Sequence, residues 1–142
     1  MKIRVLLVDD HAILRDALRL MLEQSGDIEV VAEAGDGQAA LDLVARTDPD
    51  VIVMDAAMPI MSGAEATRRI LRKNPKARVL ALTAYTDKRF VTEMMNAGAM
   101  GYVTKTAASD KLLEAIRRTA QGLPYLCPVV SAVLVDSMRN NA

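Results

Sequence analysis

Three aspartates follow apolar segments in a pattern that indicates a shared site. Asp55 ends the apolar segment 51–54, and the pair Asp9-Asp10 directly follows another apolar segment at residues 3–8. Apolar, β-branched segments of this length are typical of strands buried on both faces of a parallel sheet. The carboxyl ends of such strands share one edge, where α/β proteins bind their ligands. We therefore expect the three carboxylates to converge at that edge.

Carboxylates that lie close together oppose one another's ionisation, and a bound cation relieves that repulsion. Mg²⁺ is the cation expected here, because it prefers oxygen ligands and is commonly held by one or two carboxylates and several waters. A second interpretation stays open for Asp9 or Asp10 taken alone. Either side chain would be well placed to cap the helix expected to begin near Ala12.

Two more polar residues are expected at the same edge. Thr83 follows the apolar segment 78–82, and Lys105 follows the short segment 101–104. A hydroxyl and an ammonium beside an acidic cation site suit a phosphoryl group. Asp55 would act as the nucleophile, because carboxylates are established acceptors in aspartyl-phosphate chemistry. Mg²⁺ and Lys105 would balance the charge on the phosphoryl oxygens, and Thr83 would donate a hydrogen bond to one of them.

Strands and helices alternate along the chain, which predicts a parallel sheet covered on both faces. We expect a doubly wound α/β fold of the flavodoxin-like type, a three-layer αβα sandwich whose five-stranded sheet has the order 2-1-3-4-5. The expected strands are 3–8, 28–34, 51–55, 78–83 and 101–104. The expected helices are 12–24, 38–46, 63–73, 88–96 and 110–121.

These motifs closely resemble the receiver domains of two-component response regulators. The resemblance lies in residues 8–11, 54–59 with Ser62-Gly63, 82–84 and 97–105, in the order and spacing of that family. It covers about residues 1–121. The segment 120–126 is similar to the end of receivers of the NarL/FixJ (LuxR-type) subfamily.

The resemblance implies that a histidine kinase phosphorylates Asp55 and that the modified domain controls transcription. The implied Mg²⁺ ligands are Asp9, Asp10, Asp55 and the backbone carbonyl of Ala57. The residues implied to read the phosphorylated state are Thr83, Lys105 and Tyr102. Simple packing in a short strand is an alternative role for Tyr102.

The last part of the chain differs in character from the rest. We assign residues 1–121 to the receiver domain and 122–142 to an extension leading to a helix-turn-helix domain that this chain lacks. Within the extension, 129–138 is apolar enough for a short helix or a packed tail, and 137–142 has the character of a linker. We expect this chain to be part of a longer protein, the alternative being a natural single-domain protein.

The sequence shows neither the basic surplus typical of nucleic-acid-binding proteins nor the long apolar segment typical of membrane proteins. Lysine plus arginine and aspartate plus glutamate both number 18, so there is no basic surplus for DNA. DNA contact is therefore expected only through the absent C-terminal domain. The single cysteine, Cys127, excludes an intramolecular disulfide and suits the cytoplasm. The chain has no apolar segment long enough to cross a bilayer.

The first expected helix carries more apolar surface than burial against a sheet requires. Its apolar residues span roughly 200° of a helical wheel, and a core-facing stripe needs only about half of that. The surplus lies around Ile13 and Leu20, which would form a partner face or be covered by neighbouring segments. NarL-like receivers often pair through their first and fifth helices, so we expect a homodimer on phosphorylation.

We thus expect a phosphorylation-dependent signalling switch whose only chemistry is its own phosphorylation and dephosphorylation. One alternative is a stand-alone or degenerate receiver that serves as a protein-interaction module, although the intact acceptor set disfavours degeneracy. A less favoured alternative is a phosphatase of the haloacid dehalogenase type. Such enzymes carry a second aspartate two residues after the nucleophile, and here that residue is Ala57.

Overall fold

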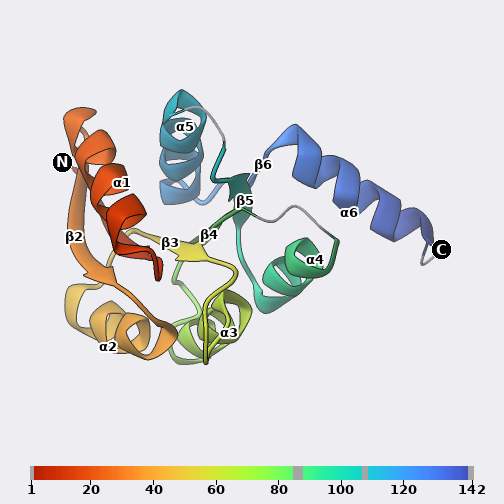
Figure 1. Ribbon diagram of the computed structural model, residues 1–142, viewed down its shortest axis with the longest axis horizontal. Helices are drawn as coiled ribbons and strands as arrows, with labels where there is room; N and C mark the ends of the chain where they lie inside the picture. The colour runs from red at the N-terminus through yellow and green to blue at the C-terminus, as the bar shows by residue number, and fades with distance from the viewer. Residues whose placement is uncertain (1, 85–87, 107–108, 141–142) are drawn as a thin grey trace.

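A computed structural model describes residues 2–84, 88–106 and 109–140 of the chain. The strands form one parallel sheet in the order β2-β1-β3-β4-β5-β6 (Figure 1). The strands are β1 (Ile3–Val8), β2 (Ile28–Ala34), β3 (Val51–Asp55), β4 (Val79–Thr83), β5 (Gly101–Thr104) and β6 (Tyr125–Leu126). The helices are α1 (Ala12–Gln24), α2 (Gly37–Thr47), α3 (Gly63–Lys73), α4 (Lys88–Ala97), α5 (Ser109–Ala120) and α6 (Pro128–Asn140).

Helices cover both faces of the sheet, as the alternation of elements predicts. Helices α1 and α5 lie on one face, and α2, α3 and α4 lie on the other (Figure 1). Successive side chains of a strand point to opposite faces. Leu6 and Val8 of β1 accordingly belong to the apolar cluster beneath α2–α4, whereas Val5 and Leu7 belong to the cluster beneath α1 and α5. The predicted doubly wound αβα sandwich is confirmed.

The predicted number of strands is wrong, because the sheet has a sixth strand. Tyr125 and Leu126 pair with Gly101 and Tyr102 of β5 in parallel. A strand of two residues is too short to show a period in the sequence. The close approach depends on the glycine, since a Cβ at position 101 would lie 2.5 Å from the Tyr125 carbonyl oxygen.

The extension after residue 121 is ordered against the rest of the fold. Helix α6 packs against α4, and its Val130 is completely buried in the apolar cluster that also contains Met94 of α4. Of the two forms expected for 129–138, the short helix is observed, and it continues through residues 137–140, while 141 and 142 lie outside the described residues. The linker role of 122–142 stays a prediction. Packing of an apolar face stabilises a helix beyond what its sequence propensity supplies.

Local signals at the start of α3 place this helix directly behind the end of β3. The Ser62 hydroxyl caps the helix by accepting a hydrogen bond from the Glu65 N–H at 3.2 Å, and the helix begins at Gly63 as expected. Gly63 follows the cap, and a Cβ there would overlap the carbonyl oxygen of Asp55. Glycine at this position thus lets the helix begin in contact with the residue that ends β3.

Within the described residues, no helix combines the length and the apolar character that a membrane crossing requires.

The packing of α6 on the domain predicts a difference between two valines of the same helix. Val130 is 0% exposed and Val135 is 48% exposed. Val130→Ala should lower the free energy of unfolding by about 2 kcal/mol, because it removes buried methyl groups and leaves a cavity. Val135→Ala should change it by less than about 0.5 kcal/mol. Urea denaturation of both variants measures the difference, and equal effects would contradict this packing.

Candidate functional site: an acidic cluster around a lysine

The predicted site residues meet at the carboxyl edge of the sheet. β1 and β3 are adjacent and parallel, with Val8 opposite Met54, so the residues that follow them are neighbours. β4 and β5 continue the same edge, where Thr83 lies opposite Thr104 and the Lys105 N–H donates to the Thr83 carbonyl at 2.7 Å. The sheet order therefore brings four separate segments of the chain together.

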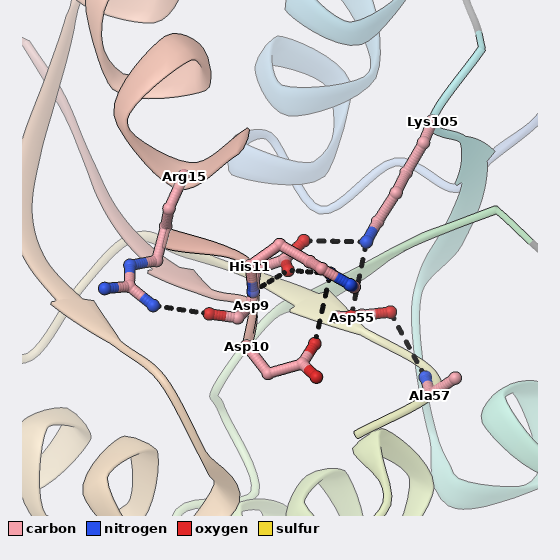
Figure 2. A network of polar contacts seen from close by, with 7 residues as sticks. All are labelled: Asp9, Asp10, His11, Arg15, Asp55, Ala57 and Lys105. Atoms are coloured by element: carbon pink, nitrogen blue, oxygen red, sulfur yellow. Dashed lines mark hydrogen bonds and ion pairs between the residues drawn. The ribbon is translucent and has the colours of Figure 1, made fainter. Parts of the chain in front are cut away.

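An ammonium group joins the two buried carboxylates of this edge. Lys105 Nζ lies 2.8 Å from Asp9 Oδ2 and 3.3 Å from Asp55 Oδ2 (Figure 2). Both aspartates are almost completely buried. Burial without a partner would strongly disfavour a charged carboxylate. The lysine therefore stabilises the ionised state of both side chains.

The other oxygen of Asp55 is held by the chain that follows it. Its Oδ1 accepts a hydrogen bond from the Ala57 N–H at 3.1 Å, and Figure 2 shows this contact on the side away from Lys105. The Asp55 carboxylate is thus fixed at both oxygens. The predicted role of the Ala57 carbonyl as a cation ligand stays a prediction, since the contacts of Ala57 in the site are made by its N–H.

Burial raises the pKa of Asp55 to about 6, and the nearby negative charge of Asp9 adds to this effect. The Ala57 N–H and the Lys105 ammonium act in the opposite direction but do not cancel it. Burial lowers the pKa of Lys105, yet its contacts with Asp9 and Asp55 outweigh burial, and its net pKa is raised. Lys105 is thus a cation at neutral pH.

Asp10 and His11 complete the acidic cluster on its exposed side. The His11 ring Nδ1 lies 3.1 Å from Asp9 Oδ1 and 3.3 Å from Asp10 Oδ1 (Figure 2). His11 is also the N-cap residue of α1, where its side chain makes no capping hydrogen bond. Asp9 Oδ1 accepts a hydrogen bond from the His11 backbone N–H at 2.8 Å. This N–H lies before the first turn of α1, so Asp9 does not cap the helix.

The donor set fits a divalent cation. Ligand atoms from Asp9, Asp10, His11 and Asp55 all lie within 4.8 Å of one another. Asp9 Oδ2 is buried and, apart from its ion pair with Lys105, makes no hydrogen bond. Hard carboxylate oxygens with exposed space for water on the Asp10 side match the preferences of Mg²⁺.

The remaining predicted residues divide into buried and exposed groups. Thr83 and Tyr102 are completely buried, and Tyr102 belongs to the apolar cluster beneath α4 that also receives Val130 of α6. Ile13 and Leu20 of α1 are 88% and 65% exposed, so neighbouring segments do not cover them. In particular, α6 lies against α4 rather than against α1 (Figure 1).

Sequence reasoning missed one residue of this region, Arg15 on the first turns of α1. Its guanidinium Nη1 donates to the Asp9 carbonyl at 2.6 Å (Figure 2). A basic residue shortly after two aspartates was the available signal. That signal is weak, because a helix surface commonly carries solvated basic residues.

A family model described as the response regulator receiver domain matches residues 5–117 of the chain. The chain belongs to the receiver domain family. Among curated relatives, the transcriptional regulatory protein DegU of Brevibacillus brevis is 38% identical over 97% of this chain. The transcriptional regulatory protein LiaR of Bacillus subtilis is 38% identical over 98% of it. This receiver domain spans 58% of the DegU length and 66% of the LiaR length.

The solved structures extend the similarity to the C-terminal segment. A two-component response regulator of the LuxR family from an Aurantimonas species superposes with a TM-score of 0.92 at 36% identity. The match covers 97% of this chain and 99% of that one. The receiver domain is thus homologous to regulators of the LuxR/NarL type, as the resemblance of segment 120–126 to the end of NarL/FixJ receivers predicts.

The buried charge of Asp55 predicts a pH-dependent effect on stability in the absence of metal. The folded pKa of about 6 exceeds the ordinary value of 3.8, so ionisation opposes folding above pH 6 and has no effect below about pH 4. Asp55→Asn should therefore raise the free energy of unfolding at pH 7.5 by about 1–3 kcal/mol. The gain should vanish as the pH falls to 4.

Urea denaturation at both pH values, with chelator present, measures this difference. Asp42→Asn on the exposed face of α2 is the matched control and should show no such gain. A variant at position 55 that is equally stabilised at pH 4 and pH 7.5 would contradict the electrostatic explanation.

Proposed function

We propose that this receiver domain accepts a phosphoryl group on Asp55 from a histidine kinase and thereby controls an attached output. One observation carries the proposal: a lysine ammonium lies within ion-pairing distance of two buried strand-end carboxylates. A structural salt bridge has no need of three clustered aspartates, and a buried ion pair contributes little net stability. A site for a transferred phosphoryl group accounts for the whole set.

In the proposed reaction, one carboxylate oxygen of Asp55 forms a bond to phosphorus. The bond between phosphorus and the donor nitrogen of the kinase histidine breaks, and the electron pair leaves with the imidazole. The Lys105 ammonium pairs with the Asp55 carboxylate before transfer and with a phosphoryl oxygen after it. The Thr83 hydroxyl donates a hydrogen bond to another phosphoryl oxygen. Phosphoryl transfer depends mainly on such positioning and charge stabilisation.

The proposed cation ligands are the carboxylates of Asp9, Asp10 and Asp55 and the Ala57 carbonyl. Mg²⁺ bound there would neutralise part of the charge on the phosphoryl oxygens. The residues of this chain hold the acceptor in place beforehand, because the Ala57 N–H and Lys105 orient the two Asp55 oxygens. Orientation before reaction lowers the entropic cost of transfer.

The residue two positions after Asp55 also favours a regulatory role over a phosphatase activity. Phosphatases that use a strand-end aspartate carry a second aspartate two residues later, and this receiver domain has Ala57 there. The methyl side chain has no group that protonates a leaving group or activates water. The domain is therefore proposed as a phosphoacceptor rather than as a phosphatase that turns over substrate.

The proposed output lies beyond the fold of this receiver domain. Its relatives DegU and LiaR are transcriptional regulatory proteins, and this chain spans only part of their length. We therefore propose that DNA is contacted through an attached helix-turn-helix domain that follows residues 122–142. A kinase donor and a DNA target would both be available in the cytoplasm, which is the location we propose.

Helix α6 offers a route from the acceptor site to such an output. β5 leads into Lys105 at one end, and along its length it pairs with β6, from which α6 continues. Tyr102 of β5 shares an apolar cluster with Val130 of α6. In this proposal, Thr83 moves towards the phosphoryl group and Tyr102 responds, which shifts a pre-existing equilibrium of α4 and α6.

The first test of the proposal is the position of the label. Incubation with acetyl phosphate and Mg²⁺ should add one phosphoryl group, and mass spectrometry should locate it on Asp55. Asp55→Asn should remain folded and unlabelled, and chelation of the metal should prevent labelling of the native chain. Asp42→Asn should be labelled as the native chain is. Label that persists in the Asp55 variant would show that another residue is the acceptor.

The second test concerns association through α1. We propose that phosphorylation favours a homodimer in which Ile13 and Leu20 lie at the interface, since their exposure leaves a large apolar area open to a partner. Sedimentation with beryllofluoride should then show a dimer that Ile13→Asp and Leu20→Asp weaken by 10-fold or more. Val135→Asp on the exposed face of α6 is the control. A monomer at high protein concentration, or a dimer indifferent to both α1 variants, would exclude this interface.

A further inference from the structure

We propose that Arg15 is a positioning residue for the cation site, acting on the peptide group that joins Asp9 to Asp10. The inference rests on the proposed function, since it concerns how this receiver domain holds Mg²⁺. Arg15 is not a ligand. Its guanidinium contacts the backbone between two of the aspartates rather than their carboxylates (Figure 2).

The backbone of Asp9 is anchored at both of its polar groups. Its N–H donates to the Ala34 carbonyl of β2 at 3.0 Å. Its carbonyl accepts from Arg15 Nη1 at 2.6 Å, a short and charge-assisted hydrogen bond. These two contacts restrain the backbone of the segment that joins β1 to α1, in addition to the contacts of the Asp9 side chain.

The guanidinium is itself held in place by β2. Arg15 Nε lies 3.3 Å from Glu33 Oε1, and the other oxygen of Glu33 pairs with Arg19 Nη1 at 2.9 Å. Gly35 leaves room for the guanidinium, because a Cβ at that position would lie 3.3 Å from Arg15 Nη1. About a fifth of each of the Arg15 and Glu33 side chains is exposed. The hydrogen bond to Asp9 thus comes from a fixed group rather than from a flexible surface side chain.

The hydrogen bond from Arg15 acts on a peptide group that Asp9 and Asp10 share. The carbonyl of Asp9 and the N–H of Asp10 belong to one planar peptide group. Rotation of that plane would change ψ of Asp9 and φ of Asp10, and with them the position of the Asp10 carboxylate relative to Asp9. Mg²⁺ demands near-ideal octahedral geometry from its oxygen ligands. Outer groups that orient ligands are commonly worth 10–100-fold in metal affinity.

Arg19 supplies a matched control for Arg15. It lies one helical turn further along α1 and pairs with the same Glu33, but its second partner is Glu23 rather than the Asp9 carbonyl. Arg15→Met keeps the apolar stem and removes the donors, and Arg19→Met makes the same change. Both variants lose an ion pair to Glu33. Only Arg15→Met loses the contact with the peptide between the aspartates.

The test is the dissociation constant of Mg²⁺ alone, measured by isothermal titration calorimetry without any phosphoryl donor. Arg15→Met should weaken Mg²⁺ binding by about 10-fold or more, whereas Arg19→Met should stay within twofold of the native chain. Arg15→Lys should lie between them, because lysine keeps one donor but lacks the fork that also engages Glu33. Native affinity in Arg15→Met, or an equal loss in both methionine variants, would overturn the proposal.

The rate of labelling by acetyl phosphate separates positioning of the cation site from a general structural effect. Arg15→Met should react more slowly at limiting Mg²⁺ and recover most of the native rate at saturating Mg²⁺. Slow labelling that saturating Mg²⁺ does not restore would overturn the proposal. If Arg15→Met fails to fold by circular dichroism, Glu33→Leu replaces it, since this change removes the acceptor that anchors the guanidinium and leaves Arg15. The Mg²⁺ affinity of Glu33→Leu should then fall, and a native affinity would overturn the proposal.

These outcomes are distinct from failure of the proposed function. A native chain that binds Mg²⁺ but takes no phosphate on Asp55 would contradict phosphoryl acceptance, while the comparison of Arg15→Met with Arg19→Met would still decide the role of Arg15.

Discussion

The ion pairs of Lys105 with Asp9 and Asp55 organise the acidic cluster at the carboxyl edge of the sheet. Two carboxylates that are almost completely buried repel each other, and burial adds a large cost to their charges. The ammonium group between them reduces both penalties. It does so incompletely, because the pKa of Asp55 remains raised to about 6. The cluster therefore retains an affinity for additional positive charge.

The order of the strands is the constraint that makes this arrangement available. β1 and β3 are neighbours in the sheet although a strand and two helices separate them in sequence. β5 lies two positions beyond β3, and the long lysine side chain crosses the intervening end of β4 to reach the aspartates. Helices cover the strands on both faces, and at the carboxyl edge Asp9 and Asp55 are buried while Asp10 and His11 are exposed.

The same sheet connects the acidic edge with the end of the chain. β5 is paired on one side with β4, which ends at Thr83, and on the other side with β6, which leads into α6. Tyr102 contributes to the apolar cluster that Val130 completes. A change at the edge therefore has a continuous packed path to α6. Interiors are close-packed, so this path is the one through which the proposed switch would act.

Local patterns in the sequence determined most of the framework. The apolar segments that end at Val8 and Asp55 predicted the strands, and Ser62 before Gly63 predicted the start of α3, because these features depend on neighbours in the chain. Three features depended on the tertiary structure. Gly101 allows the close approach of β6, the partners of Lys105 lie at the ends of two other strands, and Arg15 contacts Glu33 of β2 as well as the Asp9 carbonyl. Contacts between residues far apart in the chain leave no period or spacing in the sequence, and only the folded sheet decides them.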